Sequence, residues 1–158
     1  MVTTTVVLDT GLLGLLTHPR NTVESGKCKS WLRALLAAGL DVVVPEVADY
    51  ELRRELLRAH SRQGLENLDD LNRVLKYLPV TTSAMREAAE CWAAARQQGR
   101  PAAHDLDIDG DMILAGQMKA MALDDVLVAT TNVKHFTPFG DARIWASITQ
   151  GTGADSCH

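Results

Sequence analysis

Three acidic residues stand at positions where a carboxylate is well placed to do chemistry. Asp9 ends the β-branched, apolar run 4–8, and a turn follows it at once. In open α/β proteins ligands bind beyond the carboxyl ends of the strands, so a carboxylate at this position faces the usual binding edge. Glu51 lies on an amphipathic segment, and Asp111 stands at the start of the apolar helical run 112–116. Together the three acids predict a carboxylate cluster that binds metal.

A cluster of carboxylates favours a bound cation, because like charges held close together raise one another's pKa values. Oxygen ligands suit hard ions, so Mg²⁺ or Mn²⁺ is expected rather than zinc. Such an ion lowers the pKa of a coordinated water, polarises a phosphoryl oxygen and stabilises a leaving group. Asn132, which follows the expected strand 125–129, and Asp109, in an acidic segment, are candidate additional ligands.

Each acid also has an ordinary structural explanation. Asp9 is able to close its strand with an Asx turn. Glu51 is able to pair with Arg54 on the surface of a helix. Asp111, in the first turn of a helix, would complement the helix dipole. For each acid taken alone these explanations stay open, and the metal-site hypothesis rests on their combination.

Four further residues are candidates for contact with a substrate phosphate. Thr10 and Thr130 carry hydroxyls at strand ends, and Lys134 and His135 follow shortly after the run 125–129. Donors in this place would meet a phosphate held at the carboxylate cluster. A position in a surface loop is the alternative explanation for His135.

The composition limits the classes of protein to which the chain can belong. At 158 residues, with 46% hydrophobic and 23% charged residues, it fits one globular domain with a full core. A formal net charge of -4 argues against a general nucleic-acid coating protein, which would be basic. Three cysteines without CxxC spacing indicate neither a disulfide framework nor a zinc site. No signal peptide or membrane-length apolar stretch is visible, which predicts a soluble, cytoplasmic protein.

Short apolar runs alternate with amphipathic segments along the chain. Strands are expected at 3–8, 41–44, around Val80, at 125–129 and at 143–145. Helices are expected at 12–16, 24–38, 46–62, 65–78, 82–99 and 110–122, with an acidic loop before the last of them. Helices that separate buried strands predict an α/β protein: one three-layer α/β/α domain, residues 1–148, around a central, mostly parallel sheet. Residues 149–158 are expected to form a flexible tail.

Four short motifs occur in order along the chain. They are VVLDT at 6–10, a proline-opened segment at 45–54 that contains YELRR, DMILAG at 111–116, and VATTNVKHF at 128–136. Together they resemble the PIN-domain family, and most closely the VapC-type ribonuclease toxins of bacterial VapBC toxin–antitoxin pairs. The resemblance spans about residues 2–145.

This resemblance implies a PIN-like fold and a metal-dependent endoribonuclease that uses Mg²⁺ or Mn²⁺. It also implies an RNA substrate, a homodimer and a small cognate antitoxin. Asp9, Glu51 and Asp111 match the family's three most regular acidic positions, where they would hold the metal and carry catalysis. The fourth position is often Asp in the family and is Asn132 here. That difference removes one negative charge, and the number of bound ions, one or two, stays open.

Two other classes of protein fit the sequence less well than a ribonuclease does. A phosphotransfer enzyme with Asp9 as nucleophile generally needs a second acid two residues later, where this chain has Gly11. Receiver domains need paired acids after the first strand. The remaining alternative is a catalytically weak PIN-like module that binds RNA or protein, and the intact acidic trio argues against it.

Overall fold

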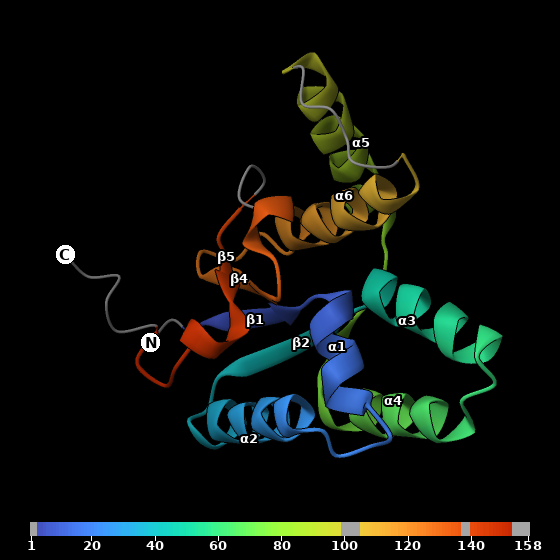
Figure 1. Ribbon diagram of the computed structural model, residues 1–158. Helices are drawn as coiled ribbons and strands as arrows, with labels where there is room; N and C mark the ends of the chain where they lie inside the picture. The colour runs from blue at the N-terminus through green and yellow to red at the C-terminus, as the bar shows by residue number, and fades with distance from the viewer. Residues whose placement is uncertain (1–2, 99–104, 137–139, 153–158) are drawn as a thin grey trace.

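The structure is a computed structural model that describes residues 3–98, 105–136 and 140–152. Its centre is a five-stranded sheet in the order β3-β2-β1-β4-β5, in which every neighbouring pair is parallel (Figure 1). The strands are β1 (Thr5–Leu8), β2 (Asp41–Pro45), β3 (Lys76–Leu78), β4 (Val126–Thr130) and β5 (Ala142–Ile144). The expected α/β fold with a central parallel sheet is therefore confirmed.

Helices cover both faces of this sheet. The helices are α1 (Thr10–Thr17), α2 (Val23–Ala37), α3 (Glu46–Arg58), α4 (Arg62–Val74), α5 (Thr82–Gln97) and α6 (Asp105–Ala120), with short 3₁₀ turns η1 (Val133–His135) and η2 (Trp145–Ser147). In Figure 1, α1, α2 and α4 lie on one side of the sheet, whereas α6 lies on the other with α5 outside it. The result is the expected three-layer arrangement.

The core follows from the alternation of side chains along β1. Val6 and Leu8 point into a cluster built with α1, α2 and α4, whereas Val7 points the opposite way, toward Leu114 of α6. All four residues of β1 are buried, as a central strand with both faces covered requires. This position makes β1 the only one of the described strands that pairs with both β2 and β4.

Two expectations near α4 are wrong. The helix expected at 65–78 ends at Val74, and the strand expected around Val80 lies earlier, at β3. Leucines continue at helical spacing through Leu75 and Leu78, so periodicity alone does not reveal the break. Parallel pairing of β3 with β2 takes these residues into the sheet, and Leu75 has an extended backbone.

The helix expected at 46–62 also ends early, at Arg58. His60 has a positive φ of 52°, and Ser61 then caps α4 by accepting the backbone N–H of Gly64 at 3.3 Å. A new helix therefore starts within the segment that the sequence pattern joined to the previous one. Thr81 caps α5 in the same way, because its side chain accepts the backbone N–H of Ala84 at 3.1 Å.

Helix α6 starts earlier than the expected residue 110, and this difference affects the site. The helix begins at Asp105, so Asp105, Asp107 and Asp109 lie on a helix and not in the expected acidic loop. Alternation of acids with Leu106 and Ile108 hid the helical period in this stretch. Asp111 consequently lies beyond the first turn of α6, and capping of the helix start does not explain it.

No helix among the described residues is both long and apolar enough to cross a membrane. At the C-terminal end, Ile148 is buried and its carbonyl accepts the Trp31 indole N–H at 2.9 Å. Residues 149–152 then form a turn closed by a backbone hydrogen bond of 3.0 Å between Thr152 and Thr149. The rest of the expected tail, residues 153–158, lies outside the described part.

Contact between α5 and α6 depends on Gly116, where a side chain would strike backbone. A Cβ at this position would lie 2.2 Å from the Ala84 carbonyl oxygen and 2.8 Å from the Ala88 nitrogen. We expect Gly116→Ala to lower the free energy of unfolding by about 1–3 kcal/mol, because α5 has to move. Urea denaturation measures this change.

The matched control is Gly14→Ala in α1, where the added methyl would make an ordinary 3.8 Å contact with Leu52. Helix propensity predicts that this variant gains up to about 1 kcal/mol. If both glycine variants were as stable as each other, close approach at Gly116 would not be what sets the packing of α5.

Candidate active site

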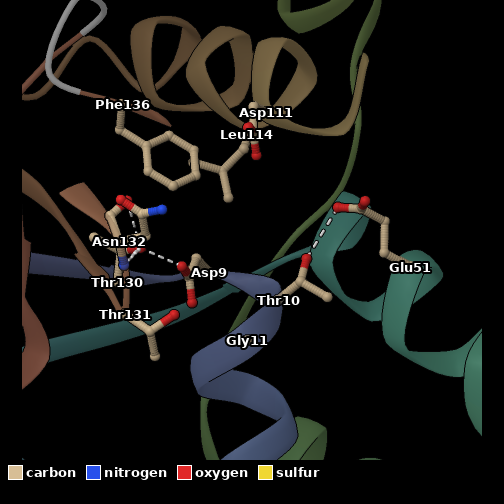
Figure 2. A pocket seen from close by; sticks show the side chains of 10 residues that line it. All are labelled: Asp9, Thr10, Gly11, Glu51, Asp111, Leu114, Thr130, Thr131, Asn132 and Phe136. Atoms are coloured by element: carbon tan, nitrogen blue, oxygen red, sulfur yellow. Dashed lines mark hydrogen bonds between the residues drawn. The ribbon is translucent and has the colours of Figure 1, made fainter. Parts of the chain in front are cut away.

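A pocket of about 250 Å³ opens at the carboxyl edge of the sheet. Its lining comes from the end of β1 (Asp9, Thr10, Gly11), from α3 (Glu51), from α6 (Asp111, Leu114) and from the segment after β4 (Thr130, Thr131, Asn132, Phe136) (Figure 2). The three acids that the sequence singled out therefore lie around one pocket, although three separate elements carry them. Parallel strand ends meet at this edge, which is why distant segments converge here.

Asp9 both begins α1 and faces the pocket. It is the N-cap of α1, and its Oδ1 accepts the Leu12 backbone N–H at 2.8 Å. Its Oδ2 accepts the hydroxyl of Thr130, and the residue is only 8% exposed. Asp9 thus has a structural role, as a helix N-cap in place of the expected Asx turn, and that role does not exclude a function. Both carboxylate oxygens are held in place before any ligand arrives.

Glu51 approaches the pocket from α3 and is half-buried. Its Oε1 accepts the Thr10 hydroxyl at 2.9 Å, which ties α3 to the start of α1. Its Oε2 lies 4.0 Å from the Arg54 guanidinium, at the limit of an ion pair. The expected surface pairing with Arg54 is therefore present but loose, and the hydrogen bond to Thr10 directs the carboxylate to the pocket.

Asp111 enters the pocket from above in Figure 2, beside Leu114 and Phe136. It is half-buried, and the apolar neighbours lie on the same side of the pocket. Leu114 is one helical turn further along α6 and anchors this face in the core with Val7 and Phe136. Packing of α6 on the sheet thus determines where the Asp111 carboxylate points.

The segment after β4 has two distinct parts. Thr130 is fully buried, donates its hydroxyl to Asp9 and accepts the Asn132 backbone N–H at 3.0 Å. Asn132 is exposed, and its Oδ1 accepts the Lys134 N–H at 3.2 Å, which caps η1. Asn132 is therefore a turn residue that also lines the pocket.

The other predicted site residues are distributed unevenly. Lys134 is exposed on η1, and His135 ends that turn. Asp109, proposed as an additional metal ligand, is exposed and lines a different hollow with Met85 and Trp92, between α5 and α6. The structure thus does not bring Asp109 to the pocket of the three acids.

The types of donor atom in the pocket suit a hard cation, but the acidic side chains lie too far apart to coordinate one together. Carboxylate, hydroxyl and amide oxygens face it, the donor set that Mg²⁺ and Mn²⁺ prefer. Among the described residues, however, no three His, Cys, Asp or Glu side chains are gathered closely enough to hold a metal ion. The donor types are suitable, and the acids are not drawn together into a coordination shell.

Sequence reasoning missed the apolar and glycine members of the site. Leu114 and Phe136 form one wall of the pocket. Gly11 allows close approach, because a Cβ there would lie 3.2 Å from the Thr131 hydroxyl. The available signal was their closeness in sequence to Asp9, Asp111 and the last motif. Leucine, phenylalanine and glycine are common in cores and turns, however, so their presence does not indicate a functional site.

Comparisons with known proteins identify the fold. No family model and no curated protein matches this sequence. Among solved structures, it is similar to VapBC2 from Rickettsia felis bound to a DNA fragment from its promoter, with a TM-score of 0.67, 15% identity, and coverage of 88% of this chain and 97% of that one. It is also similar to FitAcB from Neisseria gonorrhoeae (TM-score 0.66, 18% identity, 90% and 99% covered) and to DNA-bound VapBC from Salmonella typhimurium (0.59, 18%, 92% and 99%).

These likenesses extend over most of both chains, and at such low identity they establish the fold alone. Two of the three are VapBC structures, the group that the sequence motifs resemble.

The hydrogen bond from Thr130 to Asp9 gives a testable measure of how the site is held. We expect Thr130→Val, which keeps the shape of the side chain, to lower the free energy of unfolding by about 1–3 kcal/mol because a buried carboxylate loses a donor. In an Asp9→Asn background the same change should cost less, since the acceptor is then neutral. Urea denaturation of the four proteins measures the coupling, and additive effects would contradict the assignment.

Proposed function

We propose that this protein is a metal-dependent endoribonuclease that hydrolyses RNA phosphodiester bonds as the toxin of a type II toxin–antitoxin pair. The observation that carries the proposal is the convergence of Asp9, Glu51 and Asp111 around one pocket at the carboxyl edge of the sheet. The likeness of the fold to VapBC structures supports the biological setting.

In this proposal Asp9, Glu51 and Asp111 hold Mg²⁺ or Mn²⁺, and Asn132 contributes an amide oxygen. The ion supplies a water of lowered pKa and charge that stabilises the phosphodiester as it is cleaved. Because Asn132 is neutral, the pocket has three negative charges where four acids would give four. That lower charge favours one ion over two.

The neighbouring polar groups then act by holding the acids. The hydroxyl of Thr130 and the Leu12 N–H keep Asp9 in place, and the Thr10 hydroxyl does the same for Glu51. Hydrogen bonds that hold these acids reduce the rearrangement needed when charge develops in the reaction, which is a usual source of electrostatic catalysis. We therefore assign Thr10 and Thr130 to positioning in place of the substrate contacts expected from sequence.

Lys134 and His135 remain the candidates for binding the RNA backbone. Lys134 is exposed on η1, immediately after the pocket-lining Asn132. A net charge of -4 means that the chain as a whole does not attract RNA. Binding would then depend on the ion and on a few local cations, which suits a nuclease that contacts one scissile phosphate closely.

A second function is favoured by one observation. Because no three acidic, histidine or cysteine side chains are gathered for a metal among the described residues, a PIN-like module that binds RNA or protein without cleaving it is the alternative. The two functions differ in whether Mn²⁺ is needed, so one assay separates them.

The site is best tested at Asp111, because Asp9 also caps α1 and accepts a buried hydrogen bond, so its substitution changes stability as well as the pocket. We expect Asp111→Asn to reduce Mn²⁺-dependent RNA cleavage by on the order of 100-fold or more. Its thermal unfolding in metal-free buffer should match that of the native protein. Cleavage is measured on labelled RNA with Mn²⁺, and again after chelation.

Asp109→Asn is the matched control, since it makes the same change on the same helix but lines the other hollow. It should retain native activity. Full activity of Asp111→Asn would remove Asp111 from the site. A native protein that binds RNA and cleaves none with Mn²⁺ would favour the non-cleaving module.

The proposed partners are a second copy of the chain and a small antitoxin. The helix that carries Glu51 suits a protein partner, because its Tyr50 and Leu57 are 60% and 57% exposed. Apolar side chains at such exposure are favourable sites for an amphipathic partner segment. An arginine or lysine from that segment would match the acidic pocket, since guanidinium binds carboxylates bidentately.

We expect expression of this chain alone to arrest growth, and co-expression with its proposed antitoxin to relieve the arrest. Alanine in place of the partner's inserted cation should restore part of the nuclease activity of the purified complex. A complex that cleaves RNA as fast as the free protein would show that the partner does not act by filling the pocket.

A further inference from the structure

The Glu51 carboxylate lies against the backbone of α6 at Gly110, the residue before Asp111. A Cβ built on Gly110 would lie 2.5 Å from Oε2, 2.7 Å from Cδ and 2.7 Å from Oε1 of Glu51. All three atoms of the carboxylate fall inside contact distance, so the group occupies the space that any side chain at position 110 would take.

Glycine at position 110 lowers the stability of α6 relative to alanine. Inside a helix, glycine is less favourable than alanine by about 1 kcal/mol, because it has more conformational freedom to lose. Gly110 lies in the interior of α6, and no positive φ is recorded for it that would demand glycine. Turn geometry therefore does not account for the residue, whereas the close approach of Glu51 does.

We propose that Gly110 is a positioning residue for Glu51. Without a side chain, α6 comes close enough to α3 for the Glu51 carboxylate to be held between Thr10 and the Gly110 backbone. Thr10 donates to Oε1 from one side, and Gly110 limits the movement of the carboxylate on the other. The same helix presents Asp111 to the pocket one residue later, so one contact sets two of the three acids relative to each other.

The Glu51 side chain can adopt another conformation if a methyl group fills this space. Its contact with Gly110 is made by the end of a flexible side chain, so an added methyl displaces Glu51 more easily than it displaces α6. The half-exposed Arg54 guanidinium lies 4.0 Å from Oε2 and offers a cation with which the displaced carboxylate can pair. We therefore expect Gly110→Ala to fold normally while its Glu51 turns away from Thr10.

The first measurement rests on the proposed metal function. Gly110→Ala should bind Mn²⁺ about tenfold or more weakly than the native protein by titration calorimetry, as changes to the supports of metal ligands commonly do. Its melting temperature in metal-free buffer should be unchanged or raised, because alanine is the better helix former. Gly26→Ala in α2 is the control: nothing lies within 4 Å of its Cβ, so it should gain stability and keep native Mn²⁺ affinity.

The second measurement does not depend on metal or on nuclease activity. Thr10→Val removes the donor to Glu51 and should lower the melting temperature of the native protein by about 2–4 °C. In a Gly110→Ala background the same substitution should have little effect, because the hydrogen bond is already lost. In a Gly26→Ala background it should cost as much as in the native protein.

The two measurements separate the inference from the function on which its consequence rests. If the native protein binds no Mn²⁺ but the Thr10 effect disappears in Gly110→Ala, the positioning role stands and the metal proposal fails. If the native protein binds Mn²⁺ and Gly110→Ala binds it equally well, with the full Thr10 effect, the positioning role is overturned. A marked loss of stability in Gly110→Ala would equally overturn it, because the helix and not Glu51 would then have moved.

Discussion

The hydrogen bond from the Thr130 hydroxyl to Asp9 joins the end of β4 to the end of β1 at the centre of the sheet. Much of the site depends on this contact. Asp9 uses its other oxygen to begin α1, which places Thr10 where it can donate to Glu51 on α3. Hydrogen bonds thus run from one strand end through two acids to a neighbouring helix. These groups are buried or half-buried, so the loss of one partner leaves an unsatisfied polar group. The free-energy cost of that loss keeps the side chains in this arrangement.

Repulsion between carboxylates would destabilise the same region without these hydrogen bonds. Asp9, Glu51 and Asp111 place like charges around one pocket, which raises the free energy of the fully ionised state. Donated hydrogen bonds and the N-terminus of α1 offset part of that cost for Asp9. The remainder is what a cation would relieve. A basic side chain of a partner would relieve this repulsion as a metal ion would.

Helix α6 links the site to the outer layer through two residues without side chains. At Gly110 it lies against the Glu51 carboxylate, and at Gly116 it lies against the backbone of α5. These contacts set how closely α6 approaches the helices on either side of it. Leu114, between them, fixes its rotation against the sheet. The position of Asp111 is therefore a consequence of packing along the whole helix, since a rigid element transmits a shift at one end to the other.

The sequence by itself determined the alternation of strands and helices, the parallel sheet and the three acids, because β-branched runs, helical periodicity and a carboxylate at a strand end are local signals. It did not determine where α4 gives way to β3, since leucine spacing continues through the break and pairing with β2 decides the outcome. It also offered Asp109 as an additional ligand beside Asp111, whereas the structure places Asp109 at a different hollow. The positioning roles of Thr130, Thr10 and Gly110 were likewise invisible. Each depends on an atom supplied by an element distant in sequence, and such contacts exist only after the layers have packed.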